Sequence, residues 1–133
     1  ILKKDFFNIN KKIIHVHPGD IFKYKGSTPY YYQIIEKKSL TFTSFFMQPK
    51  LDSGKPIISE THKINDIKKV DLKFLDEIYD PFLRGKILIK TLNALSKKET
   101  TRTNYNKHTK RTPFFIIHPV LKYLSINNNS KMR

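Results

Sequence analysis

Three sets of side chains in this sequence have the types and spacing to do chemistry, and the first is a pair of histidines. His15 and His17 flank one valine, which places both imidazoles on one face of a β-strand, as in some metal sites. A metal would need further ligands from His62, His108, His118 or an acid, and none of these lies at a spacing that matches a known site. We therefore expect no metal, and we assign the pair to a polar sheet face or to phosphate contacts.

The second set is acidic and consists of Asp71, Asp76, Glu77 and Asp80. Neighbouring carboxylates can act as acid and base, so a small metal-dependent nuclease is one hypothesis for the chain. Helical spacing spreads these side chains over a solvated face, and Asp80 before Pro81 is typical of a helix N-cap. Because the sequence has no glycine-rich phosphate loop, nucleophile elbow or cysteine, we predict no catalytic residue and no cofactor.

The third set is a basic C-terminal region. Residues 83–133 hold twelve Lys or Arg and one acid, Glu99, and so supply +11 of the formal net charge of +15. Lysine and arginine displace condensed counterions, and hydroxyl and amide groups donate to phosphate oxygens. Tyr105 and His108 could stack on unpaired bases. The predicted RNA-binding residues are Lys97, Lys98, Arg102, Tyr105, Lys107, His108, Lys110, Arg111, Lys131 and Arg133.

The overall composition sets limits on the class of protein. With 133 residues the chain fits one compact domain, and its apolar runs are too short to span a bilayer. We see no secretory signal or transit peptide at the start. Lysine outnumbers arginine 22 to 4, which indicates an AT-rich gene such as organelles carry. Glutamate codons are nearly as A-rich as lysine codons, so the excess of positive charge looks selected.

The elements that position these side chains follow from the residue patterns. We predict strands over 13–17, 21–24, 30–36 and 40–47, with a hairpin at residues 37–39 and a loop over 49–56. Apolar periodicity predicts helices over 71–79 and, restarting at Asp80, to about Leu95. The fold class is therefore α+β: a small antiparallel sheet or partial barrel, then a helical pair, then an extended basic C-terminal arm. Residues 1–96 would form the single domain, and residues 97–133 the arm with a short hydrophobic anchor at 114–124.

The region from Asp80 onward resembles a ribosomal small-subunit head protein, the family numbered nineteen. That family has Gly-Pro-Phe before a helix, then a basic Lys-Thr-Trp-Ser-Arg-Arg-Ser-Thr stretch, then Pro-x-Phe-Ile. The matching segments here are Asp80-Pro81-Phe82, Arg102-Thr103-Asn104-Tyr105-Asn106-Lys107-His108-Thr109 and Pro113-Phe114-Phe115-Ile116. Asn104 replaces the family's tryptophan, and its Gly-His-Lys-rich end is missing. The composition also resembles that of mitochondrial ribosomal proteins.

These observations together predict a non-enzymatic protein, a structural constituent of a mitochondrial ribosome. Its partners would be ribosomal RNA and neighbouring ribosomal proteins, with no membrane span and no small-molecule substrate. The alternative is a peripheral basic subunit of an organellar membrane complex, either respiratory or ATP synthase. The metal-dependent nuclease is the third hypothesis.

Overall fold

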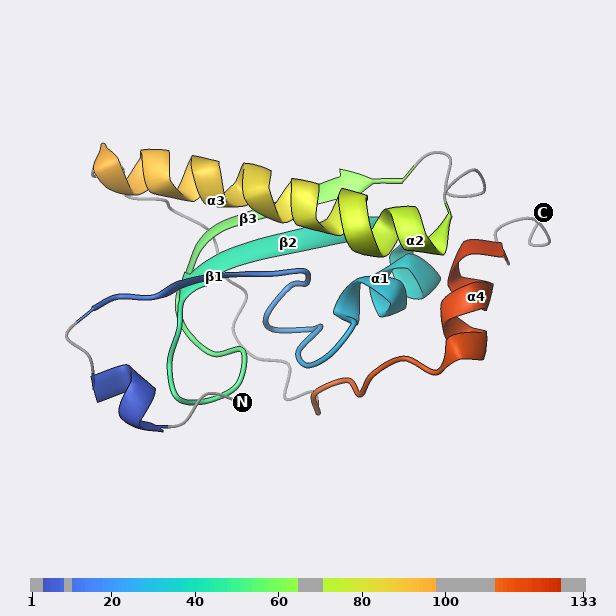
Figure 1. The fold of residues 1–133 in the computed structure, drawn as a ribbon, viewed down its shortest axis with the longest axis horizontal. Helices are drawn as coiled ribbons and strands as arrows, with labels where there is room; N and C mark the ends of the chain where they lie inside the picture. Colours follow the sequence, from blue (N-terminus) through green and yellow to red (C-terminus); the bar gives the residue numbers. More distant parts are fainter. Residues whose placement is uncertain (1–3, 9–10, 65–70, 98–111, 128–133) are drawn as a thin grey trace.

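A three-stranded antiparallel sheet forms the centre of the computed structural model, which describes residues 4–8, 11–64, 71–97 and 112–127 (Figure 1). In chain order the elements are the 3-10 helix η1 (Lys4–Asn8), β1 (Ile14–His17), α1 (Pro29–Lys37), β2 (Ser39–Phe46), β3 (Pro56–Lys63), α2 (Leu72–Phe74), the π-helical turn η3 (Leu75–Tyr79), α3 (Asp80–Ser96) and α4 (Pro119–Asn127). The predicted α+β class with a small antiparallel sheet is confirmed. Most of the predicted basic arm, residues 98–111, lies outside the described residues.

The two faces of the sheet have different roles. Strand β2 lies in the middle, paired with β1 on one side and β3 on the other. Val16 is opposite Ser44, and His17 is opposite Thr43. Because side chains alternate along a strand, Val16 and Ser44 share the face that α3 covers, whereas His15, His17 and Thr43 point to the other face. The two histidines therefore leave β1 on the face opposite Val16, and His15 also lies at the sheet edge beside Arg84 and Leu88 of α3.

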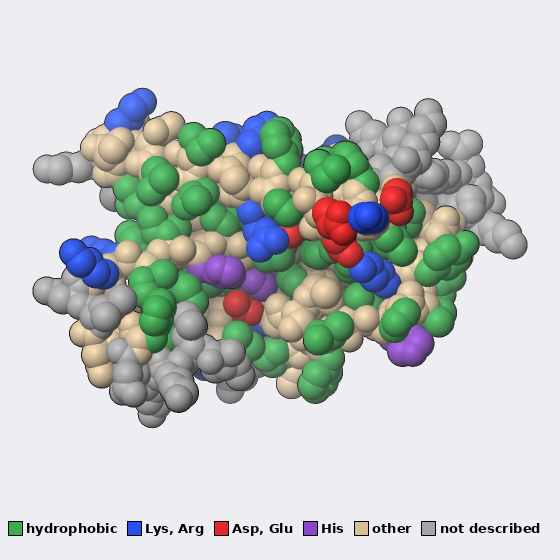
Figure 2. All heavy atoms as spheres, viewed as in Figure 1, with side chains coloured by type: hydrophobic (Ala, Val, Ile, Leu, Met, Phe, Trp, Pro, Cys, Tyr) green, Lys and Arg blue, Asp and Glu red, His purple; other side chains and the backbone are tan. Residues whose placement is uncertain are grey.

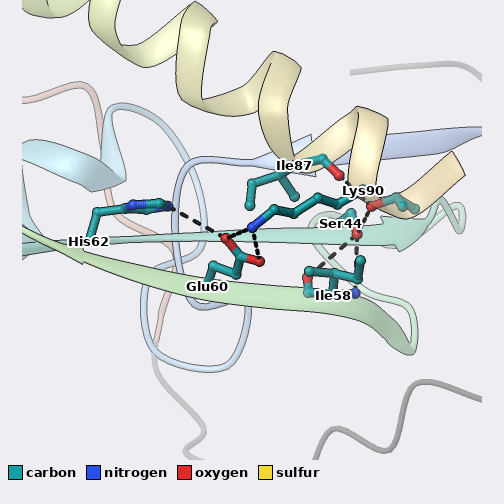
Figure 3. A network of polar contacts seen from close by, with 7 residues as sticks. Ser44, Ile58, Glu60, His62, Ile87 and Lys90 are labelled. Carbon is teal, nitrogen blue, oxygen red and sulfur yellow. Dashed lines mark hydrogen bonds and ion pairs between the residues drawn. The ribbon is translucent and has the colours of Figure 1, made fainter. Parts of the chain in front are cut away.

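Helix α3 is held on the sheet by an apolar core and by a polar network (Figure 3). Phe42 and Ile87 are almost fully buried between the two layers. The Thr91 hydroxyl lies 2.7 Å from the Ser44 Oγ, to which it donates, and Ser44 Oγ accepts from the backbone N–H of Ile58 at 3.2 Å. Nearer the surface, an ion pair joins Lys90 of α3 to Glu60 of β3 at 2.7 Å. These contacts fix the helix relative to β2 and β3.

Two of the predicted strands are wrong. Residues 21–24 form a turn, in which the Asp20 carbonyl accepts from the N–H of Tyr24 at 2.7 Å. Residues 30–36 lie in helix α1, because Pro29 suits a first helical turn and because Tyr30, Tyr31 and Ile34 bury one face. Aromatic residues favour strands only weakly, and here packing decides. The predicted hairpin at 37–39 is instead the end of α1, where Lys38 takes a left-handed conformation with φ 51°.

The predicted N-cap at Asp80 is wrong, because α3 continues directly from the helical turn before it. The chain is helical from Leu72 to Ser96, and its N-cap is Asp71, whose side chain accepts from the Lys73 N–H at 3.2 Å. The π-helical turn η3 inside this run carries Asp76. Its carboxylate accepts from the hydroxyls of Tyr30 and Tyr31 in α1, and from the Lys122 ammonium in α4. Asp76 therefore joins three helical segments and is not a freely solvated side chain.

Residues 112–127 return to the domain. Phe114 forms an isolated parallel β-bridge with Gly26, and its ring stacks on Tyr32 with centroids 4.3 Å apart. The Ile117 N–H donates to the Thr28 hydroxyl at 2.9 Å, and α4 packs against α1. Among the described helices, none is long and apolar enough to cross a membrane.

Candidate functional site

The end of strand β1 and the loop that follows it build one half of a polar site. His17 is the last residue of β1, and its side chain is 3% exposed. The loop after β1 folds back so that the backbone carbonyl of Tyr24 lies 2.5 Å from His17 Nε2. Gly19 makes this approach possible, because a Cβ there would come within 2.7 Å of the Tyr24 oxygen and 2.9 Å of His17 Nε2. The glycine therefore allows the loop to close on the imidazole.

The loop between β2 and β3 contributes the other half through Asp52. Its backbone is left-handed, with φ 41°, a conformation that L-residues other than glycine adopt infrequently and that clusters at functional sites. Asp52 Oδ2 accepts from the Gly26 N–H at 2.6 Å, which fixes the carboxylate. Asp52 Oδ1 then lies 3.5 Å from His17 Nδ1. Residues from two loops are thus held against the end of one strand.

The surroundings of the two histidines favour the neutral imidazole. Burial lowers the pKa of His17 below its ordinary value, and the Asp52 charge and the hydrogen bond to the Tyr24 carbonyl oppose this only in part. Burial, followed by the proximity of His17, lowers the pKa of His15 as well. The Arg84 guanidinium contributes a small further lowering to both. A carbonyl oxygen can only accept, so His17 Nε2 carries the hydrogen and Nδ1, in the neutral ring, has a free lone pair.

A pocket of about 310 Å³ opens beside this cluster. Its lining is mainly apolar, with Phe7, Phe45 and Leu51 around the polar side chains of His15 and Asp52. The His15 ring packs edge-on against Phe45, with centroids 5.6 Å apart. Figure 2 shows histidine side chains next to an acidic side chain near the middle of one face of the molecule. The pocket can therefore admit a small molecule to His15 and Asp52, with His17 behind them.

A second hollow of about 340 Å³ lies between β1 and α3. Arg84 lines it and pairs with Asp80, which is 8% exposed. Burial raises the pKa of Asp80, and Arg84 opposes the rise. Within the described ranges, Asp80 Oδ1 and Arg84 Nε are buried without a hydrogen-bond partner. Asp80 is therefore the buried partner of a half-exposed Arg84 and not the predicted N-cap.

The structure describes only one of the ten predicted RNA-binding residues. Lys97 lies at the C-terminal end of α3, and the other nine residues, Lys98, Arg102, Tyr105, Lys107, His108, Lys110, Arg111, Lys131 and Arg133, lie outside the described residues. The sequence interpretation noticed His15 and His17 but left Asp52 in an unassigned loop. The sequence did contain a signal for this site. His17 stands at a predicted strand end before Pro18-Gly19, and Asp52 stands in a loop before Ser53-Gly54, which are places where functional side chains are common.

Comparisons with known proteins bear on the fold of the chain. No model of a known protein family and no curated protein sequence matches it. Its structure is similar to a 4-N formyltransferase from Francisella tularensis, with a TM-score of 0.64, 18% identity, and coverage of 95% of this chain and 56% of that one. A sugar N-formyltransferase from a Shewanella species gives a TM-score of 0.60 and 18% identity, covering 88% of this chain and 51% of that one.

HypX from Aquifex aeolicus gives a TM-score of 0.61 and 9% identity over 96% of this chain and 25% of that one. The chain thus spans about half the length of the two formyltransferases and a quarter of HypX.

These likenesses correct the ribosomal interpretation. The predicted resemblance to a mitochondrial or family-nineteen ribosomal protein is wrong, as are the predicted structural role, the rRNA and ribosomal-protein partners, and the expected lack of enzyme character and of a small-molecule substrate. The membrane-complex and nuclease alternatives fall with them. The matched motifs were short: Asp80-Pro81-Phe82 lies inside a continuous helical run, and Phe114 pairs with Gly26. Net charge reports on the surface and carries no information about fold. The fold of the chain is similar to part of the fold of these two enzymes.

Proposed function

We propose that the chain supplies the proton-transfer site of a formyltransferase and acts on the amino group of a sugar. The observation that carries this proposal is the His17–Asp52 pair, of which Asp52 lines an open pocket and His17 lies buried next to it. The fold supports it, and the acceptor class comes from the descriptions of the two similar enzymes as a sugar N-formyltransferase and a 4-N formyltransferase. The chain spans about half of the length of those enzymes, and the proposal concerns the proton-transfer residues that the structure describes.

Formyl transfer requires a base, because an amine that attacks a formyl carbon must lose a proton. The acceptor amine enters the pocket and donates a hydrogen bond to Asp52 Oδ1. As the new C–N bond forms, the proton passes to His17 Nδ1, where Asp52 Oδ1 at 3.5 Å stabilises the imidazolium. The Tyr24 carbonyl accepts from Nε2–H and holds the ring in place. Because the two groups are coupled, they act as one base.

The second half of the reaction returns the proton. When the C–N bond to the formyl donor breaks, the imidazolium gives its proton to the departing nitrogen, and His17 is neutral again. His15, which lines the pocket with a pKa below the ordinary value, presents a neutral ring whose N–H can donate to the oxygen of the tetrahedral intermediate. The reaction moves one formyl group from the donor nitrogen to the acceptor nitrogen and one proton in the opposite direction, and it needs no oxidant or reductant.

The test is transfer of a ¹³C-labelled formyl group from an N-formyl donor to an amino sugar, followed by mass spectrometry in chelator-treated buffer. Wild-type protein should form the N-formyl sugar, and His17→Gln should lower the rate by about 10²–10⁴-fold. His62→Gln is the matched control, because His62 is a sheet histidine on β3 whose directly paired residue, Leu40, points to the α3 side. Absence of product with wild-type protein, or an equal rate in His17→Gln, would refute the proposal.

Three sequence predictions remain as proposals beside this one. We propose that an extended basic arm begins at residue 97, that the domain of residues 1–96 ends there although residues 112–127 pack back on it, and that the protein is mitochondrial. The basic composition of residues 97–111 supports the first two, and the AT-type codon usage implied by 22 lysines against 4 arginines supports the third. Limited proteolysis would test the boundary, and fractionation of cells with an antibody to the chain would test the location.

A further inference from the structure

The cluster of His15, His17 and Asp52 has the donor set of a metal site. Among the residues that the structure describes, one ligand atom from each of these three lies within 4.8 Å of the others. They offer two imidazole nitrogens and one carboxylate oxygen, a set that suits borderline divalent ions such as Zn²⁺ and Co²⁺. A third ligand could not be predicted from the sequence, because Asp52 comes from a distant loop. The fold brings it to the two histidines.

The hydrogen bonding of His17 and Asp52 leaves a position for a cation between them. Tyr24 presents a carbonyl oxygen to His17 Nε2, so Nε2 must carry the ring hydrogen. Nδ1 then has a lone pair, and at 3.5 Å it faces Asp52 Oδ1, which is also an acceptor. Two acceptors that face each other need a proton or a metal ion between them. A divalent metal ion between them would accept a lone pair from each.

The distance between His17 Nδ1 and Asp52 Oδ1 agrees with a metal ion between them. A tetrahedral zinc ion bound at about 2.1 Å to each ligand holds neighbouring donor atoms about 3.4 Å apart, close to the 3.5 Å between Nδ1 and Oδ1. Ligating histidines usually donate their other N–H to a backbone carbonyl, and ligating carboxylates are themselves hydrogen-bonded. Here His17 meets Tyr24 at 2.5 Å, and the Gly26 N–H holds Asp52 Oδ2 at 2.6 Å. The outer contacts of a metal site are thus already formed.

We propose that His15, His17 and Asp52 bind one divalent transition-metal ion, with Zn²⁺ as the representative of the class. His15 completes the three protein ligands by a small rotation toward His17, and the adjoining pocket of about 310 Å³ leaves room for water as the fourth. If the proposed formyl transfer is correct, the ion binds the lone pair of His17 Nδ1 that would otherwise accept the proton of the amine. Metal binding and catalysis then exclude each other, and Zn²⁺ is an inhibitor.

The test is a titration of the untagged, full-length chain with Co²⁺, followed by visible absorption, and with Zn²⁺, followed by calorimetry. We expect one ion per chain and the intense visible bands of a four-coordinate Co²⁺ site. His15→Gln and Asp52→Asn should each weaken binding at least about tenfold. The amide oxygen of Asp52→Asn can still accept from Gly26, so the loop should keep its conformation. Far-UV circular dichroism checks that each variant is folded, and His62→Gln is the control.

The results separate this proposal from the previous one. Stoichiometric binding that is lost in both variants and kept in His62→Gln supports the metal site, whatever the formyl-transfer assay gives. No binding by wild-type protein, or binding that both variants retain, overturns it. Formyl transfer is measured in chelator and metal binding without substrate, so each proposal can fail alone.

Discussion

Asp76 is the residue whose removal should cost the fold most among its exposed and half-exposed acids. Its Oδ1 accepts from the hydroxyls of Tyr30 and Tyr31, which are 7% and 0% exposed, and its Oδ2 from Lys122. Asp76→Ala leaves two buried hydroxyls without their acceptor, at about 1–3 kcal/mol each. The partly exposed pair with Lys122 adds little. We expect a loss of about 3 kcal/mol, a large part of the 5–15 kcal/mol that is typical of a domain.

The assay is urea unfolding followed by far-UV circular dichroism, since the chain has no tryptophan. Asp76→Asn should lose less, about 1 kcal/mol, because its amide oxygen can still accept from both hydroxyls. Glu77→Ala is the matched control: the neighbouring residue is exposed, and its removal changes the net charge equally. If Asp76→Ala and Glu77→Ala have the same free energy of unfolding, the proposed role of the π-helical turn in joining α1 to α4 is wrong.

Three further substitutions test the packing of the fold by the same unfolding measurement. Gly26→Ala should destabilise by about 2 kcal/mol or more, because φ is +95° and a Cβ would lie 2.2 Å from the Phe114 carbonyl oxygen; a neutral effect would contradict the observed bridge. Gly85→Ala should stabilise by about 1 kcal/mol, since nothing lies within 4 Å of its Cβ position; a loss of stability would contradict the open space at this position. Thr91→Val should cost about 1–2 kcal/mol because it removes the buried donor to Ser44, and unchanged stability would show that the network in Figure 3 contributes nothing.

The sequence predicted those elements in which local preference and tertiary packing agree. Strand β2 (Ser39–Phe46) and helix α3 (Asp80–Ser96) have strong periodic patterns, and both were found close to their predicted bounds. The prediction for residues 30–36 failed because aromatic side chains fill a helix face as well as a strand face, and the docking of α1 on β2 and α4 decides between them. That information is not local. An αL residue such as Lys38 at the helix end also looks like a hairpin turn in sequence.

For the same reason, the histidines of the site could be predicted from the sequence and the aspartate could not. His15 and His17 are neighbours along one strand, so their shared face follows from strand geometry. Asp52 meets them only because the loop between β2 and β3 folds back and Gly26 fixes its carboxylate. The basic residues dominated the functional prediction because charge is additive along a chain. A catalytic pair depends on a single contact, and charge counting cannot find it.

Both proposals require that His17 Nδ1 carries a free lone pair directed at Asp52. Two-bond ¹⁵N–¹H correlation spectra of the histidine-labelled chain, recorded at neutral pH in chelator, report the tautomer directly. The account predicts the neutral ring with the hydrogen on Nε2, because the Tyr24 carbonyl accepts from that atom. An Nδ1–H tautomer, or an imidazolium that persists at neutral pH, would remove both the proton acceptor and the metal ligand and would contradict the account.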